Sequence, residues 1–101
     1  MPMTGATDTV IPDALAELRR RIDAIDDGLI ALLAERQELA RQVAACKRLH
    51  TIPVRIPERI AAVIDRCAEE GSLQDLDPRF IRALWALIVE ETCRLEERLL
   101  A

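Results

Sequence analysis

Apolar residues recur along the first half of the chain with the alternating three and four spacing of one helix face. These positions are Leu15, Leu18, Ile22, Ile25, Leu29, Leu32, Leu39, Val43 and Cys46. Pro12 and Asp13 suit a first helical turn, and no proline follows until Pro53. The pattern predicts one helix to about Arg48, which at 1.5 Å per residue is about 50 Å long. Because a compact domain of this size has a radius of gyration of about 13 Å, the apolar face needs partners, some of them from another chain.

Two shorter helices are predicted in the second half. Pro53 and Pro57 disfavour helical geometry in the residues before them, and a helix then runs from Pro57 to a stop at Gly71. Asp77 and Pro78 provide the cap and first turn of a third helix. The inner face of the second helix is predicted to hold Ile60, Val63, Ile64 and Cys67, and that of the third Ile81, Leu84, Trp85, Ile88, Thr92, Leu95 and Leu99. Without strand patterns or internal repeats, the sequence predicts an all-α fold of three helices, one very long, one short and one medium.

The composition fits one small domain and argues against several functions. The chain has 101 residues, of which 50% are apolar, and this suits a single folded domain. We expect a flexible N-terminal tail at residues 1–11 and a helical domain at residues 12–101. A net charge of −4 argues against nucleic acid as a partner, because no basic surplus exists to neutralise phosphates. No stretch is long and apolar enough to cross a bilayer, so we expect no membrane partner and a cytoplasmic location.

The cysteines do not form a disulfide or zinc pattern. Cys46, Cys67 and Cys93 are odd in number and widely spaced, and the chain has a single histidine, His50. We therefore expect small buried thiols in a reducing compartment and a histidine at the surface.

Polar residues interrupt the apolar face of the first helix and point to a ligand site. Arg36 occupies a core position between Leu32 and Leu39, and a buried guanidinium needs an anion, a carboxylate or water. Lys47 lies 11 residues further on, which returns it to within about 20° of the same face. Trp85 and Glu96 repeat this separation in the third helix, with Thr92 between them.

Two interpretations of these polar residues stay open. A lone charge in an apolar seam can set helix register, or its long side chain can reach solvent at the helix surface. Several polar groups facing one another inside an aliphatic bundle favour a small anionic ligand instead. The run Arg19, Arg20 and Arg21 is by default a solvated face.

The chain resembles the all-helical AroQ class, or type II, of chorismate mutases. The resemblance runs from Leu15 to Leu100 and rests on LAELRRRIDAIDDGLIALLAERQELARQVAACK, on the proline loop followed by PER, and on LDPRFIRALWALIVEETCRLEE. It implies an intertwined homodimeric bundle with two equivalent active sites. Each site is expected to use mainly the residues of one subunit and one arginine of the other.

The resemblance also assigns roles to individual residues. Arg19 matches the arginine that reaches a substrate carboxylate across the dimer, and Arg36 matches the arginine that binds the other carboxylate region. Lys47 matches the lysine that donates to the ether oxygen, and Arg59 matches a further arginine of the site. Thr92 falls at a position where a small hydroxyl residue is usual, and Glu96 at a position held by Gln or Glu.

The implied reaction is the rearrangement of chorismate to prephenate, an intramolecular shift that needs no nucleophile, metal or cofactor. The enzyme holds the reactive geometry and stabilises the charge that grows on the ether oxygen. Lys47, Glu96 and Arg36 are thus the predicted catalytic residues. Glu96 can donate only when protonated, a form that burial would favour and the cation of Lys47 would oppose.

Two positions depart from the usual bacterial pattern and leave the substrate open. Ile56 and Ile60 replace the Asp and Glu expected to contact the ring hydroxyl. The loop IPVRIPERI resembles isochorismate-pyruvate lyases and 4-amino-4-deoxychorismate mutases, and ETCRLEE is similar to the latter. A chorismate mutase is therefore the leading hypothesis. Mutases of the 4-amino compound, isochorismate-pyruvate lyases and a non-catalytic helical dimer are the alternatives.

Overall fold

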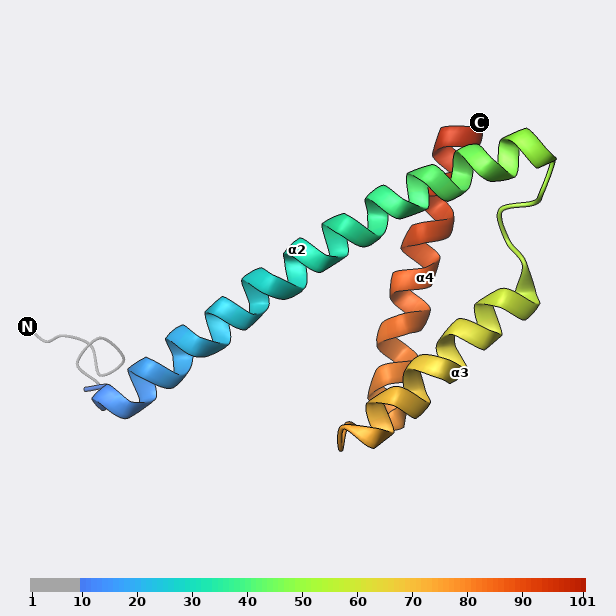
Figure 1. Ribbon diagram of the computed structural model, residues 1–101. Coiled ribbons are helices and arrows are strands. Elements are labelled where there is room, and N and C mark those ends of the chain that lie inside the picture. The colour runs from blue at the N-terminus through green and yellow to red at the C-terminus, as the bar shows by residue number, and fades with distance from the viewer. Residues whose placement is uncertain (1–9) are drawn as a thin grey trace, which may run out of the picture. The chain divides into compact units, whose positions relative to one another are not determined.

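The computed structural model describes residues 10–101 and contains three helices in that range (Figure 1). Helix α2 spans Asp13–His50, α3 spans Pro57–Leu73 and α4 spans Pro78–Leu100. The predicted all-α fold with one very long, one short and one medium helix is confirmed. The first nine residues of the expected tail lie outside the described part of the chain, and the proposed domain boundary at residue 12 stays a prediction.

Helix α2 ends two residues beyond the predicted Arg48, and its end is set by backbone geometry. Thr51 takes a left-handed conformation with φ 55, and the N–H of Ile52 donates to the carbonyl of Lys47 at 2.8 Å. This is the hydrogen bond of a Schellman cap, with threonine where glycine is usual. The chain therefore turns away before Pro53 is reached.

The predicted stop of α3 at Gly71 is wrong. The helix continues to Leu73, and the left-handed residue that follows is Asp75, with φ 61. Gly71 is buried, and a Cβ added there would lie 2.7 Å from Cγ1 of Ile81 in α4. The glycine is therefore needed for the close approach of α3 and α4. The preference of glycine for helix ends, on which the prediction rested, does not reveal such a packing role.

Helix α4 begins as predicted. The side chain of Asp77 accepts a hydrogen bond from the backbone N–H of Arg79 at 2.8 Å, and Pro78 occupies the first turn. The Asp77 carboxylate caps a free N–H and lies at the positive end of the helix dipole. Its interactions with Arg79 lower the pKa of Asp77 below the ordinary value.

The chain divides into two units, Met1–Ala34 and Glu35–Ala101. In the described part of the first unit, the large apolar residues of α2 are exposed: Leu15, Leu18, Ile22, Ile25, Leu29, Ile30, Leu32 and Leu33. The second unit has its own core, in which α3 and α4 pack closely. Its buried cluster is Val63, Cys67, Ile81, Val89 and Cys93, with Val54, Ile60 and Trp85 packed against it.

The cysteine prediction is confirmed for two of three residues. Cys67 and Cys93 are free and buried, whereas Cys46 is free and exposed on α2. Cys46 follows the apolar periodicity, but nothing in the second unit covers that side of the helix at this point. His50 is exposed, as expected.

Candidate active site

A cavity of about 370 Å³ lies within the second unit, among the end of α2, the segment 54–56, α3 and α4. Its polar lining residues are Arg36, Lys47, Arg59, Thr92 and Glu96. Its other lining residues are Leu39, Ala40, Val43, Val54, Ile56, Ile60, Val63, Val89 and Cys93. The cavity has the size and the mainly apolar wall of a small-molecule site, with a few polar groups that converge on it.

Arg36, the cation on the apolar face of α2, is hydrogen-bonded to a hydroxyl group of α4. Its Nη1 donates to Oγ1 of Thr92 at 2.6 Å, and this Oγ1 lies 3.0 Å from the carbonyl of Ile88, to which it donates its own proton. Both side chains are half-buried. Thr92 thus positions the guanidinium without neutralising it, because a hydroxyl carries no charge. Arg36 keeps its remaining N–H donors for an anion.

Lys47 is held by two acceptors. Its Nζ donates to Oε1 of Glu96 at 2.8 Å and to the backbone carbonyl of Val54 at 2.7 Å. The side chains of Lys47 and Glu96 are only 15% and 5% exposed, so this ion pair is largely removed from water. An ammonium group has three donors, and these contacts use two of them. One donor remains for a ligand in the cavity.

Arg59 and the two isoleucines complete the part of the cavity next to α3. Arg59 lies in the first turns of α3, and within residues 10–101 it forms no ion pair. Ile56 and Ile60 bring aliphatic carbon to the same wall. The cavity therefore combines three cations with a single carboxyl group, that of Glu96. Its electrostatics suit a ligand with two negative charges.

Arg19 is not among the cavity's lining residues in the described chain. It lies in the first unit, where its side chain is exposed. The structure thus brings together seven of the predicted site residues, and Arg19 is not among them: Arg36, Lys47, Arg59, Thr92, Glu96, Ile56 and Ile60. Its role across a dimer stays a prediction.

The comparisons with known proteins agree with this geometry. The family described as chorismate mutase type II matches residues 18–97 of the chain. The chain belongs to this family. The predicted recognition, and with it the prediction of a chorismate mutase-type isomerase, is confirmed.

Relatives with three different names are similar to this chain. A 4-amino-4-deoxychorismate mutase of Streptomyces pristinaespiralis is 37% identical over 100 residues, which are 99% of this chain and 76% of the relative. A chorismate mutase of Methanocaldococcus jannaschii is 32% identical over 88 residues, 87% of this chain and 89% of the relative. A bifunctional chorismate mutase/prephenate dehydratase of Escherichia coli is 40% identical over 86 residues, 85% of this chain. The match spans only 22% of that bifunctional protein.

The sequence did not identify some features of this mutase site. Val54 contributes a backbone carbonyl, which no side-chain pattern can predict. The sequence predicts Cys93 only as a buried thiol and not as a residue of the cavity wall. Burial raises the pKa of the Cys93 thiol, so at neutral pH it stays protonated and forms part of the apolar wall. No helix of residues 10–101 is long and apolar enough to span a membrane.

Proposed function

We propose that this mutase converts chorismate to prephenate in the cavity, with Lys47, Arg36 and Glu96 as its catalytic residues. The observation that carries the proposal is the pair Arg36 and Lys47, both half-buried in one aliphatic cavity and both with free donors. In the rearrangement, the carbon–oxygen bond of the ether breaks as a carbon–carbon bond forms within the same molecule. No group is transferred to the protein.

Each cation has a distinct proposed task. Arg36 and Arg59 bind the substrate carboxylates and hold the enol-pyruvyl side chain over the ring. Free substrate rarely adopts this reactive conformation, so binding lowers the entropy cost of reaching it. Lys47 donates its third N–H to the ether oxygen, where negative charge grows as the bond lengthens. A donor fixed at that point stabilises the transition state more than the ground state, because the ground-state ether oxygen carries little charge.

Glu96 is proposed to act in its protonated form. One carboxyl oxygen accepts a hydrogen bond from Lys47, and the other, which carries the proton, donates a hydrogen bond to the ether oxygen. Glu96→Gln keeps such a donor at every pH. The proposal therefore expects activity of the natural chain to fall at alkaline pH and that of Glu96→Gln to fall less steeply. Identical profiles for both proteins would overturn this role.

The proposed assembly is a homodimer in which Arg19 of a second copy reaches the cavity. The exposed apolar row of the first unit supports it, since Ile25 and Leu32 are each 63% exposed in the single chain. A continuous row of this kind favours burial against another helix. The cytoplasmic location also stays a prediction.

A second candidate substrate is 4-amino-4-deoxychorismate. The specific observation is that Ile56 and Ile60 both line the cavity, so this wall offers no carboxylate to a ring hydroxyl. Two relatives with this printed activity, 37% and 34% identical to the chain, support the alternative.

One substrate panel tests these proposals. Chorismate, 4-amino-4-deoxychorismate and isochorismate are each incubated with the protein, and products are identified by chromatography and mass spectrometry. Prephenate as the fastest-formed product supports the proposal. Faster turnover of the amino compound favours the second candidate, and pyruvate release from isochorismate indicates a lyase. No turnover of any of the three favours a non-catalytic dimer.

A further inference from the structure

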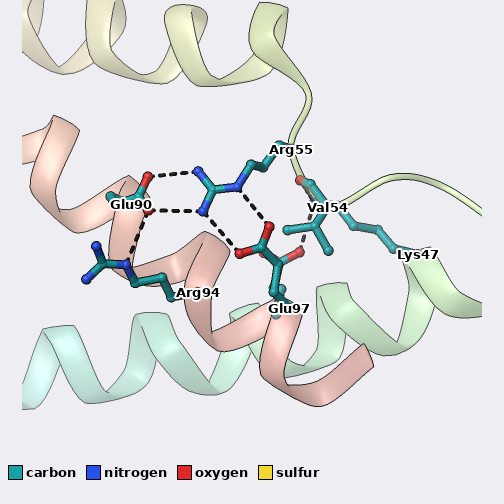
Figure 2. Close-up of polar contacts among 7 residues, drawn as sticks. Lys47, Val54, Arg55, Glu90, Arg94 and Glu97 are labelled. Atoms are coloured by element: carbon teal, nitrogen blue, oxygen red, sulfur yellow. Dashed lines mark hydrogen bonds and ion pairs between the residues drawn. The ribbon is translucent and has the colours of Figure 1, made fainter. Parts of the chain in front are cut away.

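Arg55 lies outside the cavity and binds two carboxylates of α4 at once (Figure 2). Its Nη1 and Nη2 donate to Glu90 at 2.8 and 3.0 Å, and its Nε and Nη2 donate to Glu97 at 2.8 and 3.1 Å. Both contacts are bidentate, which restricts the orientation of the guanidinium as well as its distance. Arg94 also contacts Glu90, at 3.3 Å. Arg55 therefore ties the segment between α2 and α3 to two turns of α4.

The neighbours of Arg55 in the chain both face the cavity. Val54 and Ile56 are lining residues, and the carbonyl of Val54 is one of the two acceptors that hold Nζ of Lys47. Figure 2 shows this carbonyl and the Arg55 guanidinium on the same short segment. Since adjacent residues share a nearly rigid peptide plane, the position of Arg55 constrains the position of the Val54 carbonyl.

The ordinary interpretation of such a contact is a surface ion pair of small energetic value. The side chains of Arg55, Glu90 and Glu97 are 42%, 38% and 46% exposed, and exposed pairs contribute little to stability. A contact of small energetic value can still select one conformation of a short connecting segment. The two interpretations differ in what they predict for turnover, because only the second links Arg55 to Lys47.

We propose that Arg55 is a positioning residue, which fixes the Val54 carbonyl and through it the ammonium of Lys47 at the reacting atoms. The inference rests on the proposed function of the cavity. Arg55 is not itself a lining residue, so its effect passes through the segment 54–56. Misplacement of a catalytic group by about 1 Å is enough to reduce a rate strongly.

The first test compares Arg55→Gln with Arg94→Gln. Both variants remove one positive charge next to Glu90, so they change the long-range attraction of a dianion alike, but only the first releases the segment 54–56. We expect Arg55→Gln to lower kcat at least about tenfold, as for a displaced catalytic donor. KM should change less, because Arg36 and Arg59 keep their places, and Arg94→Gln should leave kcat unchanged. Equal kcat for Arg55→Gln and the natural chain overturns the inference.

A second set of variants controls for folding and for the chemistry of position 55. Glu90→Ala combined with Glu97→Ala removes the same contacts from α4 and should reproduce the loss in kcat. Adding Arg55→Gln to this pair should cause no further loss. Arg55→Lys keeps the charge but not the bidentate geometry, so it should restore kcat only in part. A further loss in the combined variant would contradict a shared mechanism.

Amide hydrogen exchange tests the positioning without any substrate. The N–H groups of residues 54–56 should exchange faster in Arg55→Gln than in the natural chain, and at the natural rate in Arg94→Gln. If the natural chain turns over none of the three substrates, the proposed function fails, and the exchange result still decides the positioning of the segment. Unchanged exchange in Arg55→Gln refutes the inference, whatever the activity.

Discussion

The two units of this type II chorismate mutase share helix α2 and its apolar periodicity, yet they bury it differently. In the first unit Leu18, Ile22 and Leu29 are each more than half exposed. In the second unit Ala40 and Ala44, on the same helix, are 5% and 1% exposed. The second unit has a core and a cavity of its own, whereas the described part of the first has an apolar row that this chain leaves uncovered.

This difference separates what periodicity can show from what it cannot. A helical apolar pattern indicates that a face will be buried, but not whether its partner belongs to the same chain. The polar residues differ as well. Arg36 and Lys47 in the second unit have partners on α4 and in the segment 54–56, whereas Arg19 in the first unit is exposed. We propose that the first unit completes the site of a second copy.

The largest expected effect comes from Lys47→Ala in the second unit. It removes the donor proposed for the ether oxygen, and kcat should fall about a hundredfold to a thousandfold, the range seen for loss of one such donor. Arg41→Ala, an exposed change on the same helix, is the control and should keep full activity. Steady-state kinetics and thermal unfolding are measured together. Unfolding of Lys47→Ala at the assay temperature would indicate a structural rather than catalytic role.

The next effect concerns the first unit. Ile25→Glu places a charge in the exposed apolar row and should dissociate the proposed homodimer, with loss of activity, because an unpaired charge is costly to bury. Asp27→Ala, on another side of the helix, should leave association unchanged. Analytical ultracentrifugation measures the oligomeric state. A natural chain that sediments as a monomer and is fully active would contradict the account.

Adding a methyl group at a helical glycine should have opposite effects on stability in the two units. Gly71→Ala in the second unit forces a Cβ against Ile81 and should lower the free energy of unfolding by about 1–3 kcal/mol. Gly28→Ala in the first unit meets no atom of the single chain within 4 Å and should raise it by up to about 1 kcal/mol. Urea unfolding at fixed protein concentration measures both. A loss of stability in Gly28→Ala would show that a partner helix lies close to this position.

The smallest expected effect is on the pH dependence of stability, to which the contacts of Arg55 in the second unit contribute. Hydrogen bonds from Arg55 lower the pKa of Glu90 and of Glu97 below the ordinary value of 4.5. A carboxylate whose pKa is lowered in the folded state stabilises the fold at pH values above its ordinary pKa. This stabilisation is lost as the pH falls through the pKa of the folded state. The melting temperature of the natural chain should therefore fall more steeply below about pH 4.5 than that of Arg55→Gln. Parallel acid profiles would contradict this.

The sequence predicted the elements well because each has a local cause. Periodicity identified α2, and Asp77 with Pro78 identified the start of α4. Arg36, Lys47 and Glu96 were found because a charge inside an apolar face is rare and costly. The features that were missed depend on neighbours distant in sequence. Gly71 is required by Ile81, and Cys46 is exposed because no element covers that part of α2.

Arg55 and Val54 show a further limit of sequence reasoning. Arg55 lies in a loop, where an arginine is by default a solvated residue, and its partners Glu90 and Glu97 follow it by 35 and 42 positions. The role of Val54 depends on a backbone carbonyl, which every residue type offers. Only the folded chain shows which carbonyl meets Lys47.

Joining two defective chains in one dimer shows whether each site takes residues from both copies. Arg19→Ala and Lys47→Ala carry different affinity tags, are coexpressed, and the mixed dimer is isolated. In a symmetric dimer whose sites combine Lys47 of one copy with Arg19 of the other, each mixed dimer has one intact and one doubly defective site. We predict that it regains about half the kcat of the natural dimer, while each variant alone stays impaired. A mixed dimer no more active than the average of the two variants would contradict the account.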